Sequence, residues 1–138
     1  KKDIIITAGG KNIAPKNIEA ALTDHPLISQ AVVIGDRRKF LSALITYEPE
    51  GTAAWATSQG IALSDVHTNN AFVSELQGWV DTVNAKFARV EHIRKFTVLP
   101  REFSIEDGEL TPTMKIKRAV ISNAYAHQID QMYGGESQ

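Results

Sequence analysis

The sequence has 138 residues, 43% of them hydrophobic, and a formal net charge of −1. This length fits one domain, and the balance of 15 basic against 16 acidic residues argues against a dedicated nucleic-acid-binding protein. The absence of cysteine excludes a disulfide framework, a thiolate zinc site and a cysteine nucleophile, and no apolar run approaches the roughly 20 residues of a membrane span. Composition therefore predicts a soluble, globular and cytoplasmic protein.

Hydrophobic patterning predicts short strands alternating with amphipathic helices. Short β-branched or uninterrupted apolar runs are typical of strands, and apolar residues spaced by three or four are typical of helices. The helix signal is clearest at 70–87, where Phe72, Leu76 and Val80 share one face. In chain order, we predict a strand at 4–7, a helix from 15 to 24, strands at 31–34 and 41–47, helices at 50–59 and 70–87, a strand at 95–99, a loop at 101–114 and a helix at 116–132.

These elements indicate the α+β class. The apolar runs at 31–34 and 41–47 flank a polar turn at 35–39, which predicts an antiparallel hairpin. Because strands are few and helices intervene, we expect a small, mostly antiparallel sheet of about three main strands plus a short hairpin, flanked by helices. No internal repeat or low-complexity tract is visible, so residues 1–138 are predicted to form a single domain.

A glycine-containing segment between the first strand and the first helix is one candidate binding site. Its residues are Gly9, Gly10, Lys11 and Asn12. A ligand can approach glycine backbone closely, and exposed amides can bind anions. The segment matches neither the G-x-G-x-x-G nor the G-x-x-x-x-G-K-[ST] phosphate motif. On these residues alone, a tight turn that needs a positive φ is the favoured interpretation.

A second candidate is the basic cluster of Lys115, Lys117 and Arg118 at the start of the last predicted helix. The helix macrodipole makes a helix N-terminus positive, so cations at this end are electrostatically misplaced. Their retention hints at use on an anion, although a solvated helix start is the common explanation for such a cluster. The other basic run, at 37–39, lies in the predicted hairpin turn and is interpreted as solvated charge.

The histidines do not indicate a metal site. None of the four lies three or four residues from another histidine, and there is no cysteine to join them. A G-x-S-x-G nucleophile motif is also missing from the sequence. We therefore predict no metal ligand.

Four stretches of the sequence match, in order, the motifs of one enzyme family. They are KKDIIITAGGKNIAP followed by Ile18 and Glu19, VIGDRRKFL, FTVLPREFS, and GELTPTMKIKR. Together they resemble the C-terminal domain of AMP-forming acyl-CoA synthetases of the adenylate-forming superfamily, in the style of long-chain fatty acid–CoA ligases. No single motif is decisive, but their order and spacing are specific and cover nearly the whole chain. The resemblance is weakest in the helical region at 50–87.

The resemblance implies an enzyme that joins a fatty acid to CoA in two steps, using ATP and Mg²⁺. ATP, Mg²⁺ and the fatty acid would be bound mainly by an N-terminal domain outside this chain, which is the expected partner of the small domain. In the first step the small domain presents Lys115 as the catalytic lysine that assists formation of acyl-AMP. The domain then rotates about a hinge residue, which matches Lys2, and presents a second face to CoA.

That second face is implied to line the pantetheine channel with Gly9, Gly10, Lys11 and Asn12. Lys117 and Arg118 are left open between contacts to CoA phosphates and a solvated helix surface. The sequence departs from the commoner family motif immediately before the catalytic lysine, where Thr113 and Met114 stand in place of Ser-Gly.

The chain opens on Lys1 rather than Met, which is expected of a fragment that starts at the interdomain hinge. Such a fragment is expected to be inactive alone, and the full enzyme to be cytoplasmic, with peripheral attachment to a membrane left open. Two alternatives stand beside the ligase. One is a non-catalytic ligand-binding or regulatory module that uses the glycine segment. The other is a protein-interaction module whose basic surface docks an acidic partner.

Overall fold

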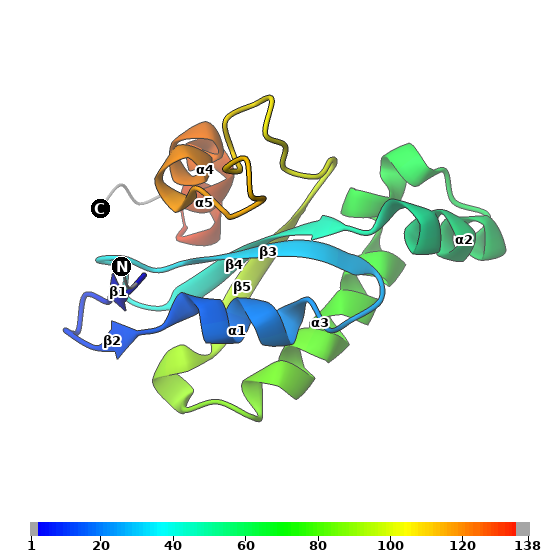
Figure 1. The fold of residues 1–138 in the computed structure, drawn as a ribbon. Coiled ribbons are helices and arrows are strands. Elements are labelled where there is room, and N and C mark those ends of the chain that lie inside the picture. Colours follow the sequence, from blue (N-terminus) through cyan, green and yellow to red (C-terminus); the bar gives the residue numbers. More distant parts are fainter. Residues whose placement is uncertain (1–2, 135–138) are drawn as a thin grey trace.

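The computed structural model describes residues 3–134, and a three-stranded sheet lies at its centre (Figure 1). The strands are β3 (Ile28–Ile34), β4 (Leu41–Tyr47) and β5 (Ile93–Leu99), in the order β3-β4-β5. Strand β4 pairs antiparallel with β3 and parallel with β5. Because β4 is the middle strand and helices cover both faces of the sheet, all of its residues are buried.

The parallel pairing of β5 follows from the long connection that leads to it. Antiparallel neighbours can be joined by a tight turn, whereas parallel neighbours need a crossover of about a dozen residues or more. This crossover contains α2 (Pro49–Gln59), a 3₁₀ helix (Leu63–Thr68), α3 (Asn70–Asn84) and a second 3₁₀ helix (Arg89–Glu91). The β3–β4 pair is the predicted antiparallel hairpin, which is confirmed.

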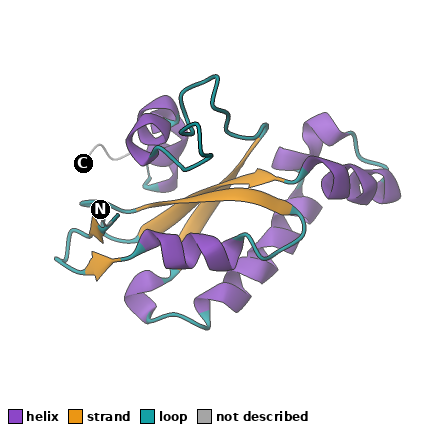
Figure 2. Ribbon diagram, viewed as in Figure 1, coloured by secondary structure: helices purple, strands orange, loops and turns teal. Residues whose placement is uncertain are grey.

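Helices lie on both sides of the sheet, which confirms the predicted α+β class (Figure 1, Figure 2). One side carries α1 (Pro15–Leu22) and α3, and the other carries α4 (Arg118–Ala124) and α5 (Ala126–Met132). Successive residues of a strand face opposite sides of a sheet. Ala43 and Ile45 of β4 therefore pack with α1 and α3, while Leu44 packs with α4 and α5.

A separate two-stranded hairpin precedes the sheet. Strands β1 (Ile5–Ile6) and β2 (Asn12–Ile13) pair antiparallel, and the turn between them contains Gly9, Gly10 and Lys11. Ile5 and Ile13 are buried, so the hairpin is packed against the body of the protein. With this hairpin included, the strand pairs are mostly antiparallel, as predicted.

The last helix differs from its prediction as one element over 116–132. It is divided into α4 and α5 at Tyr125, whose backbone angles (φ −113°, ψ 29°) lie outside the helical range. The predicted apolar face still packs into a single core across this break. The first of the two helices begins only at Arg118, because Ile116 forms an antiparallel bridge with Leu110 instead of a helical turn.

The helix predicted at 70–87 is confirmed, but it ends earlier, at Asn84. The Asn84 side chain accepts from the Ile93 amide at 2.8 Å and donates to the Ile93 carbonyl at 3.0 Å. These bonds join the end of α3 to the start of β5. The chain must therefore leave the helix at this point to reach the strand.

Candidate active-site surface

Lys115 lies in a tight turn rather than in an open loop. The Thr111 amide donates to the Lys115 carbonyl at 2.8 Å, and the Met114 amide donates to the Thr111 carbonyl at 2.8 Å. The Thr111 hydroxyl also accepts from the Lys115 amide at 3.0 Å. Lys115 is exposed. The turn, which we call the lysine turn (residues 111–115), thus fixes the backbone of Lys115 and leaves its ammonium group accessible.

The segment that precedes the lysine turn is held in place by the buried carboxylate of Glu109. The Lys117 amide donates to the Glu109 carbonyl at 2.9 Å. The Glu109 side chain, 3% exposed, accepts from the Ser104 amide at 3.1 Å and pairs with Arg101 at 3.3 Å. The hydrogen bond to Glu109 raises the pKa of Arg101. The loop at 101–110 is therefore an ordered support for the lysine turn.

The glycine segment forms a second turn of the same design. The Thr7 amide donates to the Lys11 carbonyl at 3.0 Å, and the Gly10 amide donates to the Thr7 carbonyl at 2.9 Å. The Thr7 hydroxyl accepts from the Lys11 amide at 3.2 Å. Gly10 has φ 83°, so the tight turn with positive φ interpreted from the sequence is present. We call residues 7–11 the glycine turn. Both turns read Thr-x-x-x-Lys.

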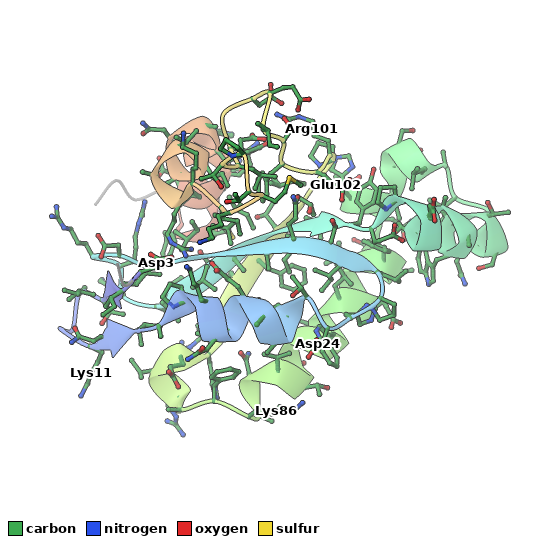
Figure 3. All side chains as sticks on the ribbon, in the orientation of Figure 1. Asp3, Lys11, Asp24, Lys86, Arg101 and Glu102 are labelled. Carbon is green, nitrogen blue, oxygen red and sulfur yellow. The ribbon has the colours of Figure 1, made fainter. Side chains whose placement is uncertain are left out.

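The residues predicted to line the pantetheine channel are accessible in this structure. Gly9, Gly10, Lys11 and Asn12 are all exposed. Lys11 projects from the tip of the β1–β2 hairpin, away from the rest of the protein (Figure 3). Exposure makes these residues available to a ligand or a second domain, and their role in the channel stays a prediction.

The polar turn between β3 and β4 supports the glycine turn. The Asp36 carboxylate accepts from the Ile6 amide at 3.1 Å, and the Ala8 amide donates to the Arg38 carbonyl at 2.9 Å. The interpretation of this turn as solvated charge is wrong for Arg38. Its side chain is only 18% exposed, and its guanidinium carbon lies 4.5 Å from the centre of the Tyr133 ring. The turn therefore connects the glycine turn to the end of α5.

Arg118 begins α4 and turns its side chain into the protein. Nη1 donates to the Glu19 carboxylate at 2.6 Å and to the Val33 carbonyl at 2.8 Å, and Nη2 donates to the Asp3 carboxylate at 2.5 Å. Burial alone would lower the pKa of Arg118, but the hydrogen bonds to Glu19 and Asp3 outweigh it, and the pKa is raised. An internal anion thus offsets the misplacement expected for a cation at a helix start. A phosphate contact by Arg118 stays a prediction.

We expect Arg118→Met to lower the free energy of unfolding of this chain by about 3–5 kcal/mol, because it leaves the buried Glu19 carboxylate without its cation. Urea unfolding measures the change. Lys117→Met is the matched control, since Lys117 is exposed and a surface substitution changes stability by about 0.5 kcal/mol or less. Adding Glu19→Gln to Arg118→Met should restore part of the stability. Equal stability of Arg118→Met and Lys117→Met would contradict the assignment.

An open cavity of about 700 Å³ lies beside the lysine turn. It is lined by Met114 and Lys115, by Lys16, and by Asp3 and Arg118. The fold thereby brings the catalytic-lysine candidate and Asp3 to the same cavity. Lys117 and the four predicted channel residues lie elsewhere on the surface, outside the lining of this cavity.

Three of the expectations concern metals, membranes and the hinge. Within residues 3–134, no group of three or more His, Cys, Asp or Glu side chains is arranged to hold a metal ion. Across the same residues, no helix combines the length and the apolar composition needed to cross a bilayer. Lys2, the predicted hinge, lies outside the residues that the structure describes.

Sequence reasoning missed two kinds of residue in this region. Asp3 and Glu19 were not identified as the partners of Arg118, since nothing in their local pattern points to a residue so far along the chain. Thr7 and Thr111 were not identified as the residues that hold the two turns. A signal for them does exist, because each precedes a candidate lysine by four positions.

Comparison with known sequences shows the family. The chain matches the family described as AMP-binding enzyme C-terminal domain over residues 2–137. It is 44% identical over 140 residues to the long-chain-fatty-acid–CoA ligase FadD15 of Mycobacterium tuberculosis, covering 99% of this chain and 23% of that protein. It is 40% identical over 158 residues to the long-chain-fatty-acid–CoA ligase ACSBG1 of Rattus norvegicus, covering 99% of this chain and 22% of that protein. The chain thus spans about a quarter of the length of these relatives.

Comparison with solved structures agrees with the sequence match. The fold superposes with a TM-score of 0.78 on the adenylation domain of a carboxylate reductase from Mycobacterium chelonae, at 25% identity. The match covers 95% of this chain and 19% of that one. The resemblance inferred from the sequence motifs is therefore confirmed. The chain belongs to the family of AMP-binding enzyme C-terminal domains and is homologous to long-chain fatty acid–CoA ligases.

Proposed function

We propose that this chain is the mobile C-terminal domain of an AMP-forming long-chain fatty acid–CoA ligase, and that Lys115 is the lysine of its adenylation step. One observation carries the proposal. Lys115 is exposed on a turn fixed by its own backbone hydrogen bonds, beside an open cavity, in the stretch that matches the family's lysine motif. A rigid support for a mobile cation is what delivery of one charge into a second domain requires.

In the first half-reaction, a carboxylate oxygen of the fatty acid attacks the α-phosphorus of ATP. The new phosphorus–oxygen bond gives acyl-AMP, and the bond to pyrophosphate breaks. Negative charge builds up on the phosphoryl oxygens, so positioning and electrostatics supply most of the catalysis. The Lys115 ammonium is a compact charge with three donors, suited to bridging the carboxylate and the α-phosphate.

In the second half-reaction, the domain rotates about Lys2 and brings the glycine turn to the acyl-AMP. The sulfur of CoA attacks the acyl carbonyl carbon, and AMP leaves. Gly9 and Gly10 present backbone without side chains, so pantetheine can pass close to them, with Lys11 and Asn12 beside it. ATP, Mg²⁺ and the acyl chain bind mainly to the part of the protein outside this chain. Two faces on one rigid unit can serve the two steps in turn.

The two remaining basic residues have different parts in this proposal. Lys117 is exposed and is the better candidate for a contact to a CoA phosphate. Two nitrogens of Arg118 already donate to carboxylates, so Arg118 anchors the lysine turn next to Asp3.

The proposal is tested with the full-length protein. We expect fatty-acid-dependent exchange of pyrophosphate into ATP and formation of acyl-CoA when CoA is added. The 138-residue chain alone should show neither activity, because the acyl and ATP pockets lie outside it. Full-length protein that forms no acyl-AMP from any fatty acid would overturn the ligase proposal and favour a ligand-binding or interaction module.

A further inference from the structure

The two turns differ at the one position where their backbone is unusual. The fourth residue of each turn has a positive φ, 83° at Gly10 and 68° at Met114. A turn of this kind, in which the fourth residue is left-handed, favours glycine there because a Cβ is disfavoured at positive φ. The glycine turn follows this rule. The lysine turn has a methionine at the same position.

Packing within the described chain does not account for the methionine. Met114 is 62% exposed, the highest value among the exposed large hydrophobic residues at 3–134. A buried side chain could compensate for an unfavourable backbone, but this one has most of its surface in water. Unfavourable backbone that persists without local compensation is typical of functional sites.

The position of Met114 indicates what its side chain is for. It precedes Lys115 directly and lines the same cavity of about 700 Å³. The lysine turn therefore presents one apolar side chain and one cation side by side. A fatty acid has the matching chemistry, with a carboxylate head joined to an apolar chain.

We infer that Met114 is a substrate-binding residue that contacts the first methylenes of the acyl chain while Lys115 holds the carboxylate. The inference rests on the proposed function, because it needs Lys115 to meet a fatty acid. The lysine turn then contacts both the carboxylate and the methylenes next to it. A glycine at position 114 would suit the backbone better and would lose the contact with the methylenes.

The test uses three variants of the full-length enzyme. Met114→Asn removes the apolar group but keeps the turn, because asparagine tolerates the left-handed region. It should raise the KM for fatty acid in the adenylation step by about 10-fold, the size expected for one lost apolar contact. The KM for ATP and the conversion of supplied acyl-AMP to thioester should not change. Met114→Leu, which keeps an apolar side chain, should have a KM for fatty acid close to that of the wild type. Ile105→Asn, at another exposed apolar residue, is the control and should leave it unchanged.

Each outcome decides the inference. An unchanged KM for fatty acid in Met114→Asn would overturn the inference. An equal rise in the KM for ATP would also overturn it, because it would show a disturbed turn rather than a lost acyl contact. Thermal unfolding identifies misfolding, which is not expected because the backbone becomes less strained. The result is separable from the proposed function. If Lys115→Ala abolishes adenylation and Met114→Asn has no effect, only the role of Met114 fails.

Discussion

Lys115→Ala in the full-length enzyme is expected to slow acyl-AMP formation by about 10²–10³-fold, the cost of removing one oriented group that stabilises transition-state charge. This substitution should remove the ammonium group without disturbing the fold of the lysine turn. Lys115 contributes its amide and carbonyl to the lysine turn, and both remain after truncation of the side chain. The turn and the thermal stability should therefore be unchanged. Pyrophosphate exchange measures the adenylation step.

Two comparisons separate a catalytic role from a general loss of charge. Lys117→Ala removes an exposed lysine two positions away and should leave adenylation close to wild type. Thioester formation from supplied acyl-AMP should survive in Lys115→Ala, because the proposed function assigns that step to the other face of the domain. Wild-type rates of acyl-AMP formation in Lys115→Ala would overturn the assignment of the lysine.

Gly9→Val is expected to have the second large effect, on thioester formation. If Gly9 lines the pantetheine channel as proposed, a bulky side chain there should slow that step by about 10²-fold through misplacement of the thiol, and change adenylation less than about twofold. Gly9 is a better test than Gly10. A Cβ on Gly9 meets only the Thr7 hydroxyl, at 4.0 Å, whereas Gly10 has positive φ, so any substitution there strains the turn itself.

The control for this variant is the same substitution at a distant glycine. Gly78 in α3 is exposed, and a Cβ placed on it meets no atom within 4 Å. Gly78→Val should leave both half-reactions near wild type. Measuring each step separately, from ATP and fatty acid and then from supplied acyl-AMP and CoA, locates the defect. Equal damage to both steps in Gly9→Val would indicate a folding defect and contradict the channel role.

Most residues of the candidate site could be proposed from the sequence because they lie in contiguous motifs. Lys115 lies within the stretch that resembles the family's lysine motif, and Gly9 and Gly10 follow a recognisable strand. The roles of the residues in the basic cluster at 115–118 are harder to assign from the sequence. Lys117 and Arg118 have the same local appearance, and only contacts distinguish the exposed lysine from the arginine held by carboxylates.

The sequence by itself determined the α+β class and most of the main elements, though not all of their ends, since strand and helix periodicity are properties of neighbouring residues. The buried strand β4 and the apolar face of α3 can both be predicted from the local spacing of apolar residues. Tertiary structure alone decided the rest. Arg118 meets Glu19 and Asp3 across 99 and 115 residues of chain, and β5 joins β4 in parallel only after a long crossover. The bridge between Leu110 and Ile116, which flanks the lysine turn, likewise could not be identified from the sequence. Such contacts depend on which distant segments pack together, and this cannot be inferred from local periodicity.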